Sequence, residues 1–128
     1  MLYNYDKGNQ MKNTILITGG AGFIGSNLVK NLLDTTNHEI IVIDRDGRNV
    51  GRLERLTMDC REFTIYNDCY GNIINEVLSE HVPDTLIHLA AVPRVAFSVE
   101  HPDTTTYENT YLLTKLLNKC KNSNCVKR

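Results

Sequence analysis

Apolar residues follow two alternating patterns along the chain: short continuous runs, and longer runs in which they recur every three or four positions. The short runs predict buried strands at residues 14–18, 39–43, 62–66 and 85–89. The spaced runs predict helices at residues 22–33, 70–81 and 105–121. Because strands and helices alternate, the pattern favours a parallel sheet with right-handed crossovers.

The helical segments also carry stripes and end signals. The first stripe consists of Ile24, Leu28 and Leu32, the second of Ile73, Ile74, Val77 and Leu78, and the third of Leu113, Leu116, Leu117 and Cys120. Pro83 should end the second helix, and residues 105–108 resemble a capping box that opens the third. Residues 46–60 are polar and ambiguous, and residues 91–102 are expected to form a loop.

These elements predict an α/β fold, a Rossmann-like doubly wound parallel sheet of about four strands in the order 3-2-1-4. A complete fold of this kind has about six strands, so the sheet is expected to be incomplete. Residues 125–128 would be the beginning of a fifth strand. We expect one domain at residues 13–128, truncated before a catalytic region, and an N-terminal extension at residues 1–12.

Composition narrows the function classes. The 128 residues carry a net charge of −1, without the basic excess that marks nucleic-acid binding. No run approaches the roughly 20 apolar residues of a membrane span, and the polar N-terminus lacks a signal-peptide core, so we expect a cytoplasmic protein without membrane partners. No C-x-x-C pair occurs, which favours free thiols and no metal site; the four cysteines are Cys60, Cys69, Cys120 and Cys125.

A glycine-rich turn at residues 18–25 lies between the first strand and the first helix. Gly19 permits a sharp turn, Gly22 lets backbone N–H groups and the positive helix end face a pyrophosphate, and Gly25 lets the helix lie close to the strand. The spacing is G-x-x-G-x-x-G, and no Gly-Lys-Ser/Thr follows, so a P-loop is disfavoured. The turn therefore predicts a dinucleotide site.

Asp44 supports this interpretation because it ends the second strand, 25 residues after Gly19 (44 − 19). A dinucleotide site has a carboxylate for the adenosine ribose hydroxyls about 20 residues after the glycine turn. Taken alone, a strand-end Asp is as often a turn former. Arg45 could stack on adenine or meet a 2′-phosphate, yet NAD is favoured over NADP.

Together these motifs resemble the extended short-chain dehydrogenase/reductase family, the NAD-dependent epimerases and dehydratases of nucleotide sugars, with the UDP-glucose 4-epimerase type nearest. The resemblance covers residues from about 13 to 128, the N-terminal half of such enzymes. It is carried by the glycine turn, by His88-Leu-Ala-Ala91 at the end of the fourth strand, and by later residues at family-like intervals: residues 93–95, residues 98–100, Pro102 and Asn109.

The resemblance implies roles for individual residues. Backbone groups of Phe23 and Ile24 would contact the pyrophosphate, and Asp44 with Arg45 would hold the adenosine ribose. Asp68 would accept from the adenine amino group, with Cys69 nearby. The middle of the cofactor and the nicotinamide ribose would be lined by Leu89, Ala90, Ala91 and Asn109. Two alternatives stay open. Asp68 could be a helix N-cap rather than a cofactor contact, although we favour the cofactor contact. His88 could be a ligand or base, but we favour a structural histidine at the strand end.

The chain also departs from the family pattern. Leu112-Leu113 replaces Gly-Thr, and residues 46–59 lack the usual loop composition. The family's catalytic Ser or Thr, its Tyr-x-x-x-Lys pair and its substrate domain are not found among these residues. Tyr111 and Lys115 spell the motif, but they lie opposite the apolar stripe of their helix and should face solvent.

The favoured hypothesis is the NAD-binding N-terminal part of a nucleotide-sugar epimerase or dehydratase, truncated or split and inactive alone. Its partners would be a nucleotide sugar, once completed by the missing half, and a second chain or a copy of itself. One alternative is a non-catalytic NAD-binding or subunit-interaction module. Another is a minimal reductase that uses Tyr111 and Lys115, the least favoured of the three. The sequence does not select the sugar.

Overall fold

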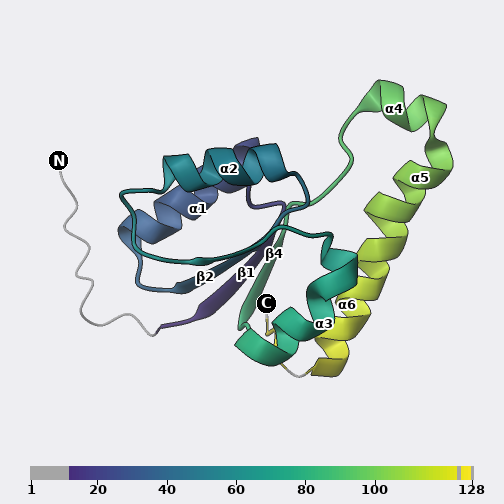
Figure 1. Cartoon of the computed structure of the whole chain (residues 1–128). Coiled ribbons are helices and arrows are strands. Elements are labelled where there is room, and N and C mark those ends of the chain that lie inside the picture. The colour runs from purple at the N-terminus through teal and green to yellow at the C-terminus, as the bar shows by residue number, and fades with distance from the viewer. Residues whose placement is uncertain (1–11, 124, 128) are drawn as a thin grey trace.

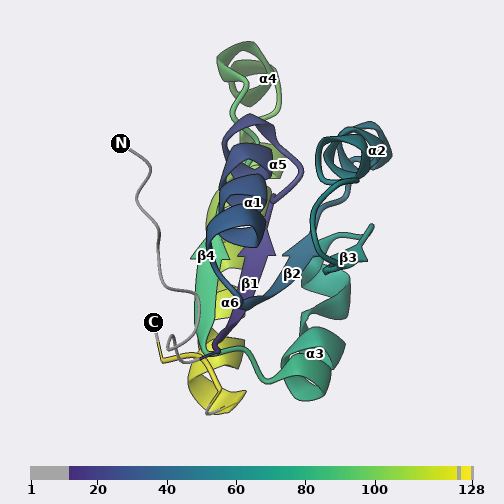
Figure 2. The same cartoon turned by 90° about the vertical axis from the view of Figure 1, so that its left-hand side faces the viewer.

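A computed structural model describes residues 12–123 and 125–127, and the expected N-terminal extension falls outside this part except for Lys12. Four parallel strands form one sheet in the order β3-β2-β1-β4, which confirms the predicted fold class (Figures 1 and 2). The elements are β1 (Thr14–Thr18), α1 (Phe23–Thr35), β2 (Glu39–Ile43), α2 (Gly47–Leu56), β3 (Thr64–Tyr66), α3 (Tyr70–His81), β4 (Thr85–His88), α4 (Val95–Glu100), α5 (Pro102–Thr106), a π-helical turn η1 (Tyr107–Tyr111) and α6 (Leu112–Ser123).

Alternate residues of the central strands point to opposite faces of the sheet, and helices cover both faces. Ile15, Ile17, Ile40 and Val42 join a core with α1 and α2, whereas Leu16, Ile41 and Ile43 join a core with α3 and α6. Figures 1 and 2 show these helix pairs on opposite sides of the sheet. This two-sided burial explains why the strands appear in the sequence as continuous apolar runs.

The stripe predicted for α1 is partly wrong. The helix buries Gly25, Ser26, Val29 and Leu33, whereas Ile24 is 69% exposed. The reason is the close approach at Gly25, where an added Cβ would lie 2.4 Å from the carbonyl oxygen of Gly19. That contact turns the Gly25 side of the helix toward the sheet and leaves Ile24 at its rim.

Residues 46–60, which showed no clear pattern, contain the helix α2. Asp46 caps it, since its Oδ1 accepts from the N–H groups of Arg48 at 3.0 Å and Asn49 at 3.3 Å. Val50 and Leu53 are its buried residues. The signals were present in the sequence, an N-cap Asp followed by apolar residues at positions 50 and 53, but two glycines and many charges obscured them.

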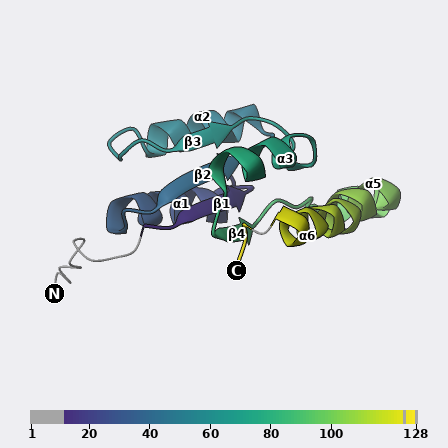
Figure 3. The same cartoon turned by 90° about the horizontal axis from the view of Figure 1, so that it is seen from below.

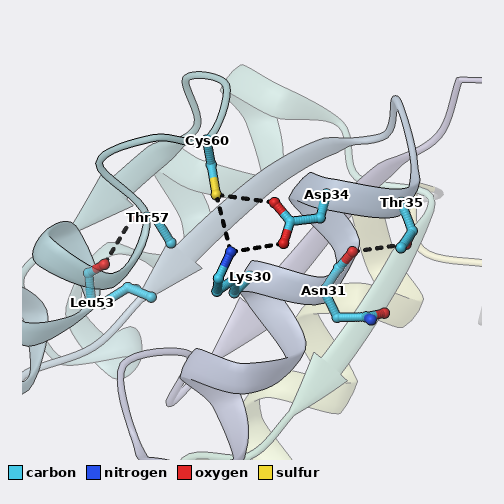
Figure 4. Close-up of polar contacts among 7 residues, drawn as sticks. All are labelled: Lys30, Asn31, Asp34, Thr35, Leu53, Thr57 and Cys60. Carbon is cyan, nitrogen blue, oxygen red and sulfur yellow. Dashed lines mark hydrogen bonds and ion pairs between the residues drawn. The ribbon is translucent and has the colours of Figure 1, made fainter.

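The segment after α2 is fastened to α1 by the polar cluster in Figure 4. Lys30 pairs with Asp34 at 2.7 Å, and the Cys60 thiol donates to Asp34 Oδ1 at 3.3 Å. Partial burial and this hydrogen bond raise the pKa of the Cys60 thiol. All four cysteines are free, as expected.

The region beyond β4 is more helical than predicted. The expected loop at residues 91–102 contains α4, and the last helical rod begins at Pro102 rather than at Thr105 (Figures 1 and 3). Thr105 and Thr106 do not cap it, because their hydroxyls bond to the carbonyl groups of His101 and Pro102, one turn earlier. Pro102 at the first helical position fits a helix start, since its missing N–H would have no partner there.

The stripe of α6 is also displaced. Leu112, Leu116 and Cys120 are buried, whereas Leu117 is 56% exposed. The π-helical turn η1 adds a residue to one helical turn and so changes the phase of the residues in α6. Leu112 fits against α3 because Gly71 lies opposite, where an added Cβ would be 3.2 Å from the Leu112 side chain.

The last described residues of the chain lie close to β4. The N–H of Lys127 donates to the carbonyl of Asp84, the residue before β4, at 2.9 Å, so residues 125–127, where a fifth strand was expected to begin, lie beside the start of β4. No strand is formed there in the described residues.

None of the helices in the described part has the length and apolar character of a membrane span.

The displaced stripe of α6 gives a direct test. Leu116→Ala should lower the free energy of unfolding by about 2–5 kcal/mol, because Leu116 is 1% exposed and its removal leaves a cavity. Leu117→Ala, its neighbour on the same helix, should change it by less than about 0.5 kcal/mol. Urea denaturation followed by circular dichroism measures both. Equal losses would contradict the observed phase of the helix.

Candidate functional site

The glycine turn lies at the carboxyl end of β1, between the neighbouring strands β2 and β4. Gly19 has a φ of 70°, and an added Cβ would lie 2.6 Å from the backbone nitrogen of Ala90. Gly22 is the N-cap of α1 and supplies no side-chain cap. The first N–H groups of α1 are therefore left to a ligand or to water at the positive end of the helix, an arrangement suited to a phosphate group.

Asp44 holds this turn in place. Its Oδ2 accepts from the N–H of Ala21, and its Oδ1 accepts from the N–H of Asp46, both at 3.0 Å. Arg52 of α2 donates to the carbonyl of Ala21 at 3.3 Å. The carboxylate thus fixes the glycine turn relative to the end of β2, and each oxygen retains a lone pair for another donor.

A cleft of about 840 Å³ opens at this edge of the sheet, a volume suited to a large organic ligand. Every residue predicted to bind a cofactor lines it except Asn109: Gly19, Gly22, Phe23, Ile24, Gly25, Asp44, Arg45, Asp68, Cys69, Leu89, Ala90 and Ala91. Sequence reasoning missed the other lining residues, which are Ile43, Asp46, Asn49, Tyr70, Val92, Pro93, Arg94, Phe97, Thr104 and Glu108.

Several of these missed residues belong to the wall opposite the glycine turn. Phe97 is in α4, Thr104 in α5 and Glu108 in η1, the segment that projects away from the sheet in Figures 1 and 2. Only their position in the folded chain brings them to the cleft. No motif in the sequence marks Phe97 or Thr104.

The end of β3 contributes Asp68 and Cys69. Asp68 Oδ1 accepts from the N–H of Cys69 at 2.6 Å and from the side-chain amide of Asn72 at 3.0 Å. The N-cap of α3 is Cys69, so the alternative in which Asp68 is the N-cap residue is not what the structure has. Asp68 is one of the residues that line the cleft.

His88 has a structural environment. Its Nδ1 lies 2.6 Å from the hydroxyl of Thr18, and its ring meets that of Tyr70 edge-on, with centroids 5.2 Å apart. Burial lowers the pKa of His88, which favours the neutral ring. His88 is not among the cleft-lining residues, in agreement with the structural interpretation.

Asn109 is engaged by the loop after β4. Its Oδ1 accepts from the N–H of Val92 at 2.7 Å, and its Nδ2 donates to the carbonyl of Val92 at 3.0 Å. The side chain therefore positions a loop residue that lines the cleft. Its expected contact with a nicotinamide ribose stays a prediction.

Tyr111 and Lys115 lie outside the cleft, as the sequence predicted. Tyr111 is 53% exposed and stacks on Tyr107, with centroids 5.3 Å apart. The ammonium group of Lys115 lies 5.6 Å from the centroid of the Tyr111 ring. The pair is exposed on the helix, and neither residue is among those that line the cleft.

An ion pair joins two walls of the cleft. Nη1 of Arg45, at the end of β2, lies 2.9 Å from Oε1 of Glu108 in η1. The hydroxyl of Tyr70 donates to the carbonyl of Glu108 at 3.4 Å. Neither residue type nor spacing predicts this contact, because 63 residues separate the partners (108 − 45).

In the described part of the chain, no group of three or more His, Cys, Asp or Glu is arranged to hold a metal ion.

Comparison with known proteins identifies relatives of this chain and of its fold. The family model for the NAD dependent epimerase/dehydratase family matches residues 15–128. A dTDP-glucose 4,6-dehydratase of Salmonella typhimurium is 35% identical over 113 residues, 82% of this chain and 31% of that protein. A UDP-glucose 4-epimerase of Yersinia enterocolitica is 34% identical over 95 residues, 70% of this chain and 27% of that protein.

Solved structures agree. The UDP-Glc/GlcNAc 4-epimerase of Campylobacter jejuni has a TM-score of 0.74 at 27% identity, covering 88% of this chain and 35% of that one. The UDP-glucose 4-epimerase of Bifidobacterium longum, solved with NAD+ and UDP, has a TM-score of 0.75 at 27% identity, with the same coverage. The chain thus spans about a third or less of the length of these relatives.

The environment of His88 predicts a pH dependence of stability. Its pKa is lowered in the folded state, so the unfolded chain binds more protons below its usual value of about 6.5. Stability should therefore fall as the pH decreases from about 6.5 toward the folded-state pKa. Thermal unfolding of His88→Gln should lack this component, whereas the exposed His101→Gln should retain it. An NMR titration that places the His88 pKa above 6.5 would contradict the assignment.

Proposed function

The chain belongs to the NAD dependent epimerase/dehydratase family, and from this we propose that its cleft binds NAD as the cofactor part of a nucleotide-sugar epimerase or dehydratase. One observation carries the proposal: the glycine turn and the Asp44 carboxylate meet at the carboxyl edge of a parallel sheet. That is where open α/β sheets bind dinucleotides.

The residues of the cleft suit the chemical groups of NAD. Backbone N–H groups at the start of α1 would face the pyrophosphate. The three glycines of the turn have no side chains that would block its approach. The remaining lone pairs of Asp44 would accept from the ribose hydroxyls, and Asp68 would accept from the adenine amino group. Small side chains at Ala90 and Ala91 would let the backbone approach the middle of the cofactor. When bound, NAD would accept a hydride from a sugar carbon.

The same residues limit what this part of the molecule does to a sugar. Proton transfer in the reaction needs an acid–base group within hydrogen-bond reach of the reacting hydroxyl. Tyr111 and Lys115 are outside the cleft. This argues against a minimal reductase that uses them as its acid–base pair. We therefore assign cofactor binding to the described residues, and we expect proton transfer and sugar recognition to need groups additional to them. The non-catalytic NAD-binding module remains the alternative.

A partner surface is part of this proposal. The residues of β4 are only partly buried, and among the described residues its one strand partner is β1. Exposed strand edges are usually covered or paired. We propose that a further strand, from a longer form of this chain or from a second copy, pairs with β4.

Binding of NAD provides the main test. The chain should bind NAD more tightly than NADP, and Asp44→Ala should weaken NAD binding by about 10- to 100-fold, since a charged acceptor is worth roughly 1.5–3 kcal/mol. Asp59→Ala, an exposed Asp outside the cleft, serves as the control. Isothermal titration calorimetry measures the affinities. Equal affinity of the wild type and Asp44→Ala would remove Asp44 from the site.

The free edge of β4 gives a second expectation. The 128-residue chain should associate with itself in a concentration-dependent manner, because pairing covers the open backbone groups of β4. Sedimentation equilibrium over a hundredfold range of concentration would detect this. A monomer at all concentrations would show that β4 needs no such partner.

A further inference from the structure

Glu108 forms an ion pair with Arg45, the residue that follows Asp44. Asp44 is the acid proposed to bind the adenosine ribose. Arg45 is 52% exposed in its side chain, so it has room to move, whereas Glu108 is 20% exposed. Both line the cleft. The more buried partner, Glu108, therefore decides where the guanidinium group of Arg45 lies.

The backbone around Glu108 is held from two sides. The hydroxyl of Tyr70 bonds to the Glu108 carbonyl, and the amide of the next residue, Asn109, makes both of its described bonds with Val92. These contacts tie η1 to the start of α3 and to the loop after β4. The carboxylate of Glu108 is thus presented from a fixed turn, and it restrains Arg45.

This arrangement matters for a ligand with a 2′-phosphate. Such a group carries nearly two negative charges and is usually bound by an Arg close to the ribose. The charged residues that line the cleft are two cations, Arg45 and Arg94, and four acids, Asp44, Asp46, Asp68 and Glu108. Arg45 follows Asp44 directly in sequence, so it is the cation nearest along the chain to the ribose acid.

We propose that Glu108 is a positioning residue that sets cofactor selection: by holding Arg45 in an ion pair, it withholds that guanidinium from a 2′-phosphate and makes the cleft select NAD over NADP. This inference rests on the proposed binding of NAD. Glu108 acts in two ways, because it occupies the donor groups of Arg45 and also repels a second anion. Exposed ion pairs are individually weak, so the effect should be about tenfold rather than several orders of magnitude.

The test compares NAD with NADP, and 5′-AMP with 2′,5′-ADP, on the full 128-residue chain. Glu108→Gln removes the charge and keeps the shape. It should lower the ratio of the NADP to the NAD dissociation constant about tenfold, with the NAD affinity changed less than about twofold. The gain should shrink as salt is raised, because both groups reach solvent. Glu100→Gln, an exposed position on α4 outside the cleft, should leave the ratio unchanged.

Arg45 must mediate the effect, so the double variant Arg45→Gln/Glu108→Gln should lose most of the gain for NADP and 2′,5′-ADP. Circular dichroism melts check that each variant folds. Glu108→Asp keeps the charge but shortens the side chain, and it should give an intermediate ratio of the NADP to the NAD dissociation constant.

Several results would overturn the inference. An unchanged ratio in Glu108→Gln with intact NAD binding would refute it alone. An equal loss of both cofactors would mean that Glu108 only supports the fold of the cleft, and a gain that persists without Arg45 would refute the mediating role. If the wild type binds neither cofactor, the proposed function fails, and this inference fails with it.

Discussion

The close approach of the glycine turn to the end of β4 is the constraint on which the rest of the structure depends. Gly19 faces the backbone of Ala90, and Gly25 faces the carbonyl of Gly19, at distances where a side chain could not fit. Because backbone meets backbone there, α1 begins close to the sheet with its first N–H groups directed toward the cleft. The same contact determines which side of α1 is buried and leaves Ile24 at the rim.

Asp44 extends this constraint to the neighbouring strand. By accepting from Ala21 and Asp46, it connects the glycine turn, the end of β2 and the start of α2 in one hydrogen-bonded unit. A residue expected to bind a ribose therefore also has a structural task. Loss of its carboxylate would disturb the turn as well as any ligand, which is why selectivity between ligands reports more on the site than affinity alone.

The opposite wall is built differently. The helical segment from α4 to η1 has no buried residue in any of its three elements. It is held through polar contacts, above all the paired bonds between Asn109 and Val92 and the ion pair between Glu108 and Arg45. Polar contacts of this kind are directional and sensitive to charge, whereas the glycine turn is defined by steric fit. The cleft thus joins a side defined by the close fit of backbone groups with a side held by polar and charged contacts.

The sequence by itself determined the strands, the sheet order, the glycine turn and most of the cleft. Two-sided burial of β1 and β2 and the missing side chains of Gly19 and Gly25 are local properties that leave a direct pattern in the chain. Only the tertiary structure decided that Leu112 rather than Leu117 is buried and that Glu108 meets Arg45. The physical reason is that these outcomes depend on helix phase, on the space left by Gly71, and on contacts between segments far apart in the sequence, which no local periodicity records.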